Sequence, residues 1–241
     1  MPPTTNEAAT GARSNTRADD LLVAGATTLG IHIGVETLAA FRAYREDLLR
    51  WSERMNLTAL VTPVQIVQQG VLDSLACAPL FPTSGGRVID IGSGAGFPAI
   101  PLALIKRECE FTLVEPSRKK VTFLRHVVRR LRLPLVRIRP NRIEALLGES
   151  AMLEAFDIAL ARAVAPLADV SRLVLPFLRP AGVFLAQVAA GANIDEVVSS
   201  LARIGFEAID EKAVPAEFGK PGRRILTLQK VKARQDGGRF T

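Results

Sequence analysis

The sequence contains little cysteine, little histidine and few aromatic side chains. Its 241 residues include two Cys, two His, one Trp and one Tyr. Two cysteines are too few for the disulfide framework of a secreted domain or for a four-ligand zinc site, and two histidines add little. We therefore expect no metal site. Aromatic residues make up 5% of the chain, which argues against base stacking as the main mode of binding any nucleic acid.

The sequence also lacks a long uninterrupted apolar run. The most apolar N-terminal stretch, residues 21–40, carries glycines, threonines, His32 and Glu36. A membrane-spanning helix needs about 20 predominantly apolar residues, and a secretory signal would have a basic flank where this stretch has acidic residues. The pattern indicates two short structured pieces broken near Gly30 and Gly34. We expect a cytoplasmic protein without a membrane anchor.

What the chain does contain is enough apolar material for a substantial core. Hydrophobic residues make up 48% of it, and Lys plus Arg exceed Asp plus Glu to leave a net charge of +7. The hydrophobic content predicts one globular domain with a small extension. The positive net charge is compatible with a polyanionic partner. Residues 1–18 show no apolar period and are predicted to be a disordered tail, and residues 232–241 a basic tail.

The rest of the chain shows two patterns of apolar residues, one before and one after about residue 80. Apolar residues recur at helical spacing over 36–55 and 63–76, so residues 19–80 are predicted to form an N-terminal helical extension. From residue 87 short apolar runs alternate with helical segments, which predicts an α/β domain over 81–231 with a doubly wound, mostly parallel Rossmann-like sheet. The expected strands are 87–91, 110–114, 135–139, 156–161, 182–187 and 224–230, and the expected helices among them are 99–106 and 117–131.

The first strand of this domain leads into a glycine-rich loop that opens a helix. The loop reads DIGSGAGFP over residues 90–98. A nicotinamide-cofactor fingerprint would place its third glycine where this chain has Phe97. Asp90 would repel a phosphate but suits a sulfonium or ammonium group, so S-adenosylmethionine is the favoured ligand, with Asp90, Gly92, Gly94 and Phe97 as candidate contacts. A purely structural turn is the alternative.

Two acidic residues follow the next two strands. Glu115 ends the second strand, about 20 residues after the glycine loop, where an acidic side chain accepts hydrogen bonds from ribose hydroxyls. Glu144 follows the third strand, where an adenine edge would lie. Together with the loop, these residues predict a nucleoside-containing cofactor.

Several blocks of the sequence, in order, resemble one known family. They are WSERMNLTA at 51–59, LDSL at 72–75, DIGSGAGFPAIPLA at 90–103, RKKVTFL at 118–124 and RA at 162–163. The chain resembles the bacterial small-subunit rRNA guanine-N7 methyltransferase family, RsmG or GidB, over about residues 21–231. The resemblance implies a class I methyltransferase fold and methylation of N7 of a guanine in 16S rRNA, near the decoding centre of the small ribosomal subunit.

The resemblance also implies particular cofactor contacts. They are Gly92, Phe97, Glu115, Pro116, Ser117, Ile143, Glu144 and Arg162. Guanine N7 carries a free lone pair, so catalysis needs alignment more than a general base. Arg162 is the candidate catalytic residue, holding the cofactor or the target base; a surface charge is the alternative for it.

The chain departs from the family at positions that could face the RNA. The family usually has His where this chain has Gly70, and a lysine after the fifth strand where this chain continues from Gln187 without one. Two alternatives therefore stay open. One is a diverged paralogue that methylates a different RNA or a small molecule, and the other is a non-catalytic RNA-binding module on the same scaffold. A nicotinamide oxidoreductase is disfavoured by Phe97.

A basic segment follows the second strand. Residues 118–142 contain ten Lys or Arg and no Asp or Glu, enough to neutralise several phosphates. A solvated helix face is the alternative. The candidate RNA-binding residues are Arg118, Lys119, Lys120, Arg125, Arg129 and Arg224. The expected partner is 16S rRNA or the small ribosomal subunit, bound by a monomer.

Overall fold

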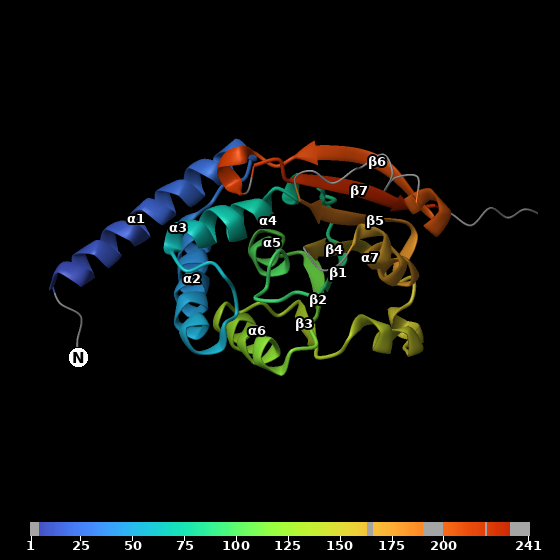
Figure 1. The fold of residues 1–241 in the computed structure, drawn as a ribbon, viewed down its shortest axis with the longest axis horizontal. Helices are drawn as coiled ribbons and strands as arrows, with labels where there is room; N and C mark the ends of the chain where they lie inside the picture. The colour runs from blue at the N-terminus through green and yellow to red at the C-terminus, as the bar shows by residue number, and fades with distance from the viewer. Residues whose placement is uncertain (1–4, 163–165, 190–199, 220, 232–241) are drawn as a thin grey trace, which may run out of the picture.

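The computed structural model describes residues 5–162, 166–189, 200–219 and 221–231, and it is built around one seven-stranded sheet (Figure 1). The strand order is β3-β2-β1-β4-β5-β7-β6, and only β7 runs antiparallel to its neighbours. The strands are β1 (Gly86–Ile91), β2 (Cys109–Val114), β3 (Val136–Arg139), β4 (Phe156–Arg162), β5 (Leu178–Val188), β6 (Phe206–Ala213) and β7 (Arg224–Lys230). The predicted doubly wound, mostly parallel α/β sheet is confirmed.

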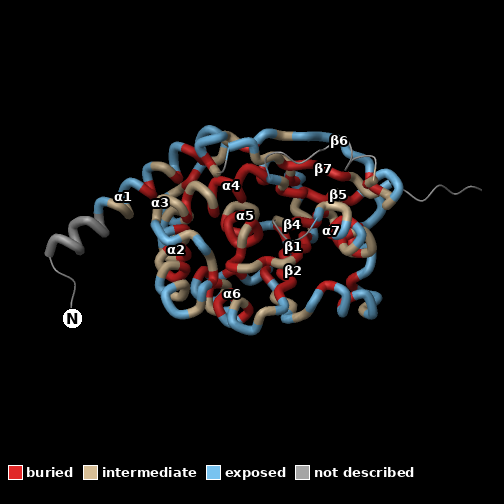
Figure 2. Tube along the Cα trace, viewed as in Figure 1, coloured by how far each residue is buried: buried red, intermediate tan, exposed pale blue. Residues whose placement is uncertain are grey.

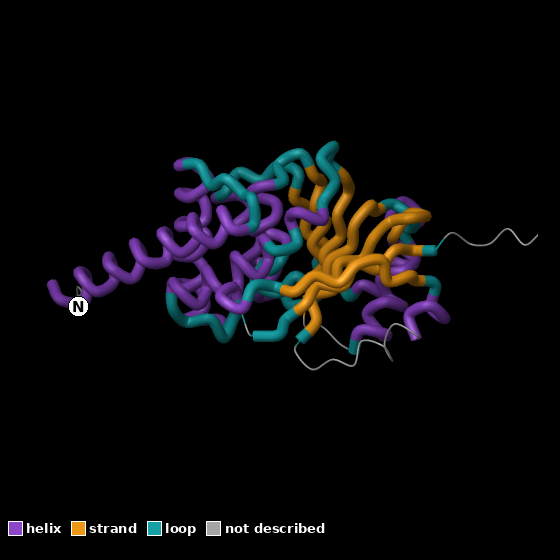
Figure 3. The backbone as a smooth tube through the Cα atoms, turned by 90° about the horizontal axis from the view of Figure 1, so that it is seen from above, coloured by secondary structure: helices purple, strands orange, loops and turns teal. Residues whose placement is uncertain are grey.

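Helices cover both faces of the sheet because its central strands are apolar on both sides. On β1, Val88 belongs to one core cluster while Ile89 and Ile91 belong to the other. The first cluster joins the sheet to α2 (Val35–Met55), α5 (Ala99–Ile105) and α6 (Arg118–Arg130), and the second joins it to α7 (Leu167–Val174). Figure 3 shows the strands between these two groups of helices, and in Figure 2 the buried residues concentrate there.

The N-terminal helices pack into the first of these two clusters. They are α1 (Thr5–Thr28), α2, and a helical segment made of α3 (Pro63–Gln65), a π-helical stretch (Ile66–Leu72) and α4 (Asp73–Leu75). The predicted helix over 36–55 is confirmed, and the one over 63–76 is confirmed with a π-helical middle. Thr62 caps its start, since the Thr62 hydroxyl accepts from the Gln65 N–H at 3.2 Å and Gln65 Oε1 accepts from the Thr62 N–H at 3.2 Å.

The expected disordered tail over 1–18 is wrong from residue 5 onward. Residues 5–18 are part of α1. This helix ends at Thr28 and the next begins at Val35, so the helical structure is interrupted close to Gly30 and Gly34, as predicted. The contact face of α1 is made of Ala18, Leu22 and Ala26, all fully buried. Near Ala18 the helix is also held by polar contacts, those of Asn15 and Asp19 with arginines of α2, which an apolar period does not reveal.

A strand was also missed in the C-terminal part of the chain. In β6 only Phe206 is buried and most of the other side chains are exposed, because β6 is an edge strand. The predicted basic tail at 232–241 lies outside the described residues. Within the described residues, no helix combines the length and the hydropathy needed to cross a bilayer.

Candidate functional site

A cleft of about 830 Å³ lies at the carboxyl ends of β1, β2 and β4. The chain winds from β1 outward through β2 and β3 and then returns to β4 on the other side of β1. Ligands of doubly wound sheets bind where the winding reverses in this way. The cleft therefore occupies the position that the topology favours for a binding site.

The cleft brings together all the predicted cofactor residues except Asp90 and Ser117. Those that line it are Gly92, Gly94, Phe97, Glu115, Pro116, Ile143, Glu144 and Arg162. They come from four segments that are far apart in the sequence.

The glycine-rich loop closes tightly under the cleft. Gly94 has φ +61° and Gly96 has φ +100°, a region that favours glycine. A Cβ at Gly96 would also lie 2.6 Å from Cγ1 of Ile100. The buried hydroxyl of Tyr44, on α2, donates to the carbonyl of Ala95 at 2.7 Å, so the N-terminal helices hold the loop in place.

Glu115 links the loop to the start of α6. Its carboxylate accepts hydrogen bonds from the backbone N–H of Gly94 and from that of Ser117, each at 2.8 Å. Glu115 is also part of the cleft wall. Ser117 donates its backbone N–H to this carboxylate and does not line the cleft. A direct contact between Ser117 and the cofactor had been predicted.

Asp90 lies beneath the loop instead of facing the cleft. It is 1% exposed and is not part of the cleft lining. On β1 its side chain follows Val88 toward the α5 side of the sheet, because alternate residues of a strand share a face. Burial raises the pKa of Asp90 to about 7, and the negative charge of Glu115 adds to this shift. Asp90 therefore supports the loop from below, and its contact with the ligand stays a prediction.

The ring of Phe97 fills the space beside Gly70. A Cβ on Gly70 would lie 2.5 Å from Cζ of Phe97, so no larger residue fits at position 70 without moving the ring. The guanidinium carbon of Arg162 lies 5.7 Å from the centre of the same ring, within cation–π range. The absence of a side chain at position 70 therefore lets the ring of Phe97 pack against this helical segment.

Arg162 belongs to a buried polar network around Asp73. Arg162 Nη2 donates to the carbonyl of Gln69 at 2.6 Å, and Nη1 lies 3.1 Å from Asp73 Oδ2. Arg223 pairs with the same carboxylate oxygen, and Gln187 Nε2 donates to the backbone carbonyl of Asp73 at 2.8 Å. Asp73 is fully buried.

Burial and ion pairing act against each other in this network. Burial raises the pKa of Asp73, while the charges of Arg162 and Arg223 lower it; burial likewise lowers the pKa of Arg162, against the charge of Asp73. Burial is the larger effect for both groups, so the pKa of Asp73 is raised and that of Arg162 is lowered. Removing either partner would leave the other as a buried unpaired charge.

The predicted RNA-binding residues occupy different environments. Arg118, Lys119, Arg125 and Arg129 are exposed on α6 and have no ion-pair partner among the described residues. The first turn of this helix borders the cleft. Lys120 lines the cleft itself, whereas Arg224 pairs with Glu211 at 2.8 Å. The structure brings Lys120 to the cofactor residues and leaves Arg224 on the far strands.

Other lining residues were not predicted from the sequence. They are Leu57, Thr58, Ala59, Leu60, Gln69, Ile91, Ser93, Ala95, Val114, Asn141, Arg142, Val170, Leu173 and Arg223. Residues 57–59 lie within a block that carried the family resemblance, so that block was a usable signal for them. Arg223, next to Arg224, was a possible addition to the RNA-binding residues as part of a basic pair near the last strand, but the sequence did not place it in the cleft.

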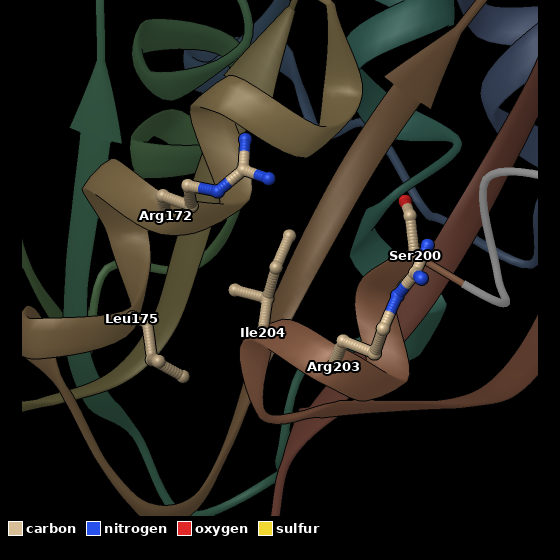
Figure 4. A pocket seen from close by; sticks show the side chains of 5 residues that line it. All are labelled: Arg172, Leu175, Ser200, Arg203 and Ile204. Atoms are coloured by element: carbon tan, nitrogen blue, oxygen red, sulfur yellow. The ribbon is translucent and has the colours of Figure 1, made fainter.

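A second hollow, of about 440 Å³, lies between α7 and residues 200–204 (Figure 4). Arg172, Leu175, Ser200, Arg203 and Ile204 line it, and none of the predicted site residues does. Within the described part of the chain, no group of three or more His, Cys, Asp or Glu side chains is arranged to hold a metal ion. The cleft beside the glycine-rich loop is therefore the candidate site.

Comparisons with known proteins agree with one another on the family. The family model described as rRNA small subunit methyltransferase G, GidB, matches residues 37–226. The chain is 37% identical over 216 residues to ribosomal RNA small subunit methyltransferase G of Caldanaerobacter subterraneus, covering 88% of this chain and 90% of that protein. It is 38% identical over 212 residues to the protein of the same name from Roseiflexus castenholzii, covering 87% and 88%.

Solved structures are similar to the fold at low sequence identity. TYW2 of M. jannaschii, solved in complex with AdoMet, aligns with a TM-score of 0.52 and 16% identity over 67% of this chain and 75% of that one. The ribosomal protein L11 methylase of Lactobacillus delbrueckii aligns with a TM-score of 0.53 and 15% identity over 67% and 78%. These similarities confirm the predicted class I methyltransferase fold.

Proposed function

The chain belongs to the GidB family, rRNA small subunit methyltransferase G, and from this premise we propose that it transfers a methyl group from S-adenosylmethionine to N7 of a guanine in 16S rRNA. The observation that carries the proposal is the cleft, where residues predicted separately for one cofactor lie together at the switch point of the sheet.

The residues of the cleft fit this cofactor. Gly94, which lines the cleft, leaves the loop backbone free of a Cβ where a ligand must approach closely. Glu115 and Glu144 both line the cleft and offer carboxylate oxygens to ribose hydroxyls and to an adenine amino group. Ile143 and Pro116 supply apolar surface for the adenine ring.

In this reaction the residues of the cleft need to align the two reactants and do not need to transfer a proton. When bound, the sulfonium supplies an activated methyl group. The N7 lone pair forms the new C–N bond as the C–S bond breaks and its electron pair passes to sulfur, so the guanine gains a positive charge and no proton is removed. The protein's contribution is to hold both partners in line and to exclude water. Arg162, fixed by Gln69 and Asp73 at the cleft wall, is placed to orient the base or the cofactor.

The RNA is expected to approach along α6. The exposed cations Arg118, Lys119, Arg125 and Arg129 extend away from the cleft on this helix, and Lys120 reaches into the cleft. Such an arrangement contacts phosphates without reading base sequence. The guanine would then be selected by the shape of the RNA together with the cleft. The substrate places the protein in the cytoplasm, where we propose that it acts as a monomer.

Methyl transfer to small subunits tests the proposal. The purified protein is incubated with radiolabelled S-adenosylmethionine and 30S subunits from a strain that lacks the gene, and the 16S rRNA is digested to nucleosides. Label in 7-methylguanosine supports the proposal. Label in another nucleoside, or in none while calorimetry still detects cofactor binding, would favour a paralogue with a changed substrate. Absence of cofactor binding would favour the RNA-binding module.

A further inference from the structure

Two arginines of the cleft converge on one buried carboxylate. We propose that Arg162 and Arg223, oriented by Asp73, form an oxyanion subsite that binds a backbone phosphate of the RNA strand carrying the target base. The inference rests on the proposed function and adds to it a residue, Arg223, that contacts the substrate.

The geometry of the three side chains supports a built subsite. Both guanidiniums pair with Asp73 Oδ2, and both line the cleft. Their side chains are 16% and 15% exposed, whereas that of Asp73 is fully buried. The buried carboxylate fixes the two cations from behind, and each keeps further N–H donors because a guanidinium has five. Two guanidiniums and one carboxylate leave one positive charge at this wall.

The charged residues of the cleft follow four strands. Glu115 and Glu144 follow β2 and β3 together with the cations Lys120 and Arg142, while Arg162 ends β4 and Arg223 precedes β7. The carboxylates after β2 and β3 suit the sulfonium and the hydroxyl groups of the cofactor. The two arginines beside β4 and β7 suit an anion, and planar guanidiniums are well matched to phosphate oxygens.

The position of Arg223 favours the RNA as the source of that anion. Its neighbour Arg224 pairs with Val188 at the end of β5, and β7 is three strands from β1, roughly 14 Å at ordinary strand spacing. An RNA strand that crosses the cleft toward β7 would pass this position. The carboxylate of the cofactor's amino acid part is the other available oxyanion, and its binding here is an alternative outcome of the test.

Arg223 also supplies a cation at the carboxyl end of β5. The last residues of this strand include Gln187, whose amide donates to the backbone carbonyl of Asp73 at 2.8 Å. Arg223, which precedes the adjacent strand β7, pairs with the side chain of the same aspartate. The polar contacts of Asp73 therefore join this end of β5 to the start of β7.

The test compares Arg223→Gln with Arg179→Gln as a matched control. Arg179 is also paired with one aspartate, Asp157 at 2.6 Å, but it lies at the start of β5, away from the cleft. We measure the KM for 30S subunits, their binding as a function of KCl, and the Kd of S-adenosylmethionine by calorimetry. For Arg223→Gln we expect KM to rise about 10-fold through loss of a charged hydrogen bond and the salt slope to fall by about one. The Kd of the cofactor should stay within about twofold.

Two further variants separate a binding role from a folding role. Arg223→Lys retains the charge and should recover much of the 30S affinity. Asp73→Asn, similar in size, should raise the KM for 30S subunits, since its effect passes through the two arginines. A thermal melt accompanies each variant, and calorimetric cofactor binding shows that it is folded.

Three results would overturn the inference. Weaker cofactor binding with an unchanged KM for 30S subunits would assign the arginines to the cofactor's carboxylate. If Arg223→Gln and Arg179→Gln had the same KM for 30S subunits and the same salt slope, Arg223 would not be part of the subsite. An unchanged salt slope would exclude a phosphate contact. Failure of the proposed function is seen separately, as absence of methyl transfer by the wild-type protein, because 30S binding is measured without turnover.

Discussion

At the scale of single residues, the carboxylate of Glu115 both holds the glycine-rich loop and lines the cleft. It accepts from the backbone N–H groups of Gly94 and Ser117 and also forms part of the cleft wall. The same carboxylate thus fixes the loop and lines the cleft.

We predict that Glu115→Gln weakens cofactor binding about 10-fold. Hydrogen bonds to an ionised acceptor contribute about 1.5–3 kcal/mol, and the amide retains only one acceptor oxygen. Calorimetric titration with S-adenosylmethionine measures the change. Glu110→Gln, on the same strand but exposed, is the control and should bind as the wild type does. Equal affinities of the two variants would contradict the role given to Glu115.

Asp90 makes stability depend on pH. Its pKa in the folded protein is about 7 because of burial, well above the unfolded value of about 3.9. The folded state therefore binds a proton more tightly, and the resulting stabilisation, full at low pH, is lost as the pH rises through 7. Relative to Asp90→Asn, the wild type should lose about 2 kcal/mol of unfolding free energy between pH 5 and pH 8.

Urea unfolding of both proteins at the two pH values measures this difference. Subtracting the Asp90→Asn curve removes the contribution of all other titrating groups that the two proteins share. Parallel pH dependence of the two proteins would show that Asp90 is already ionised in the fold at pH 5.

At the scale of elements, α1 is attached to α2 through charges. Asp19 pairs with Arg42 and, at 3.0 Å, with Arg45, which also donates to Asn15 at 3.2 Å. The side chain of Arg45 is 1% exposed. Removing its partner would leave a buried unpaired charge.

Asp19→Ala should therefore lower the free energy of unfolding by about 3 kcal/mol. Asp20→Ala changes the neighbouring exposed carboxylate and should alter stability by less than about 0.5 kcal/mol. Urea denaturation monitored by circular dichroism compares the two. Similar stabilities would mean that α1 does not depend on the Asp19 pairs.

The exposed face of α6 is expected to set the salt dependence of RNA binding. Replacing Arg118, Arg125 and Arg129 with Gln should reduce the slope of log affinity against log salt by about two to three. Cofactor affinity should be unchanged. A second triple variant, at Arg172, Arg179 and Arg203, changes the net charge equally on other exposed positions. If both triple variants lower the slope equally, the effect is one of net charge and not of α6.

The sequence predicted elements where one pattern decides the structure. The strand around Val88 is apolar on both faces, and the strand around Leu113 alternates buried with more exposed residues; both patterns were found. In contrast, β6 has an exposed face and one buried residue, Phe206, so no periodicity marks it. Residues of α1 before Ala18 were missed because a contact such as that between Asn15 and Arg45 joins positions 30 residues apart.

At the scale of the whole molecule, the N-terminal helices and the α/β domain share one of the two hydrophobic clusters. Helices α1 to α4 share a hydrophobic cluster with α5, α6 and one face of the sheet. Through Tyr44 these helices support the glycine-rich loop, and through Asp73 they support Arg162 and Arg223. The N-terminal region is thus part of the site and not only an addition to it.

The same view explains which site residues escaped prediction. The cofactor residues follow strands in a known order, so spacing identified Gly92, Glu115 and Glu144. The network around Asp73 joins segments up to 150 residues apart, and only the packed chain reveals which of the many arginines lies in the cleft.

The most direct measurement is mass spectrometry of 16S rRNA from cells that lack the gene, with and without the gene restored. The account predicts that one guanine, unmodified in the deletion strain, becomes 7-methylguanine when the wild-type protein is restored. Restoring Glu115→Gln should give a lower methylated fraction than the wild type. The same modification pattern of 16S rRNA in the presence and absence of the wild-type protein would contradict the account.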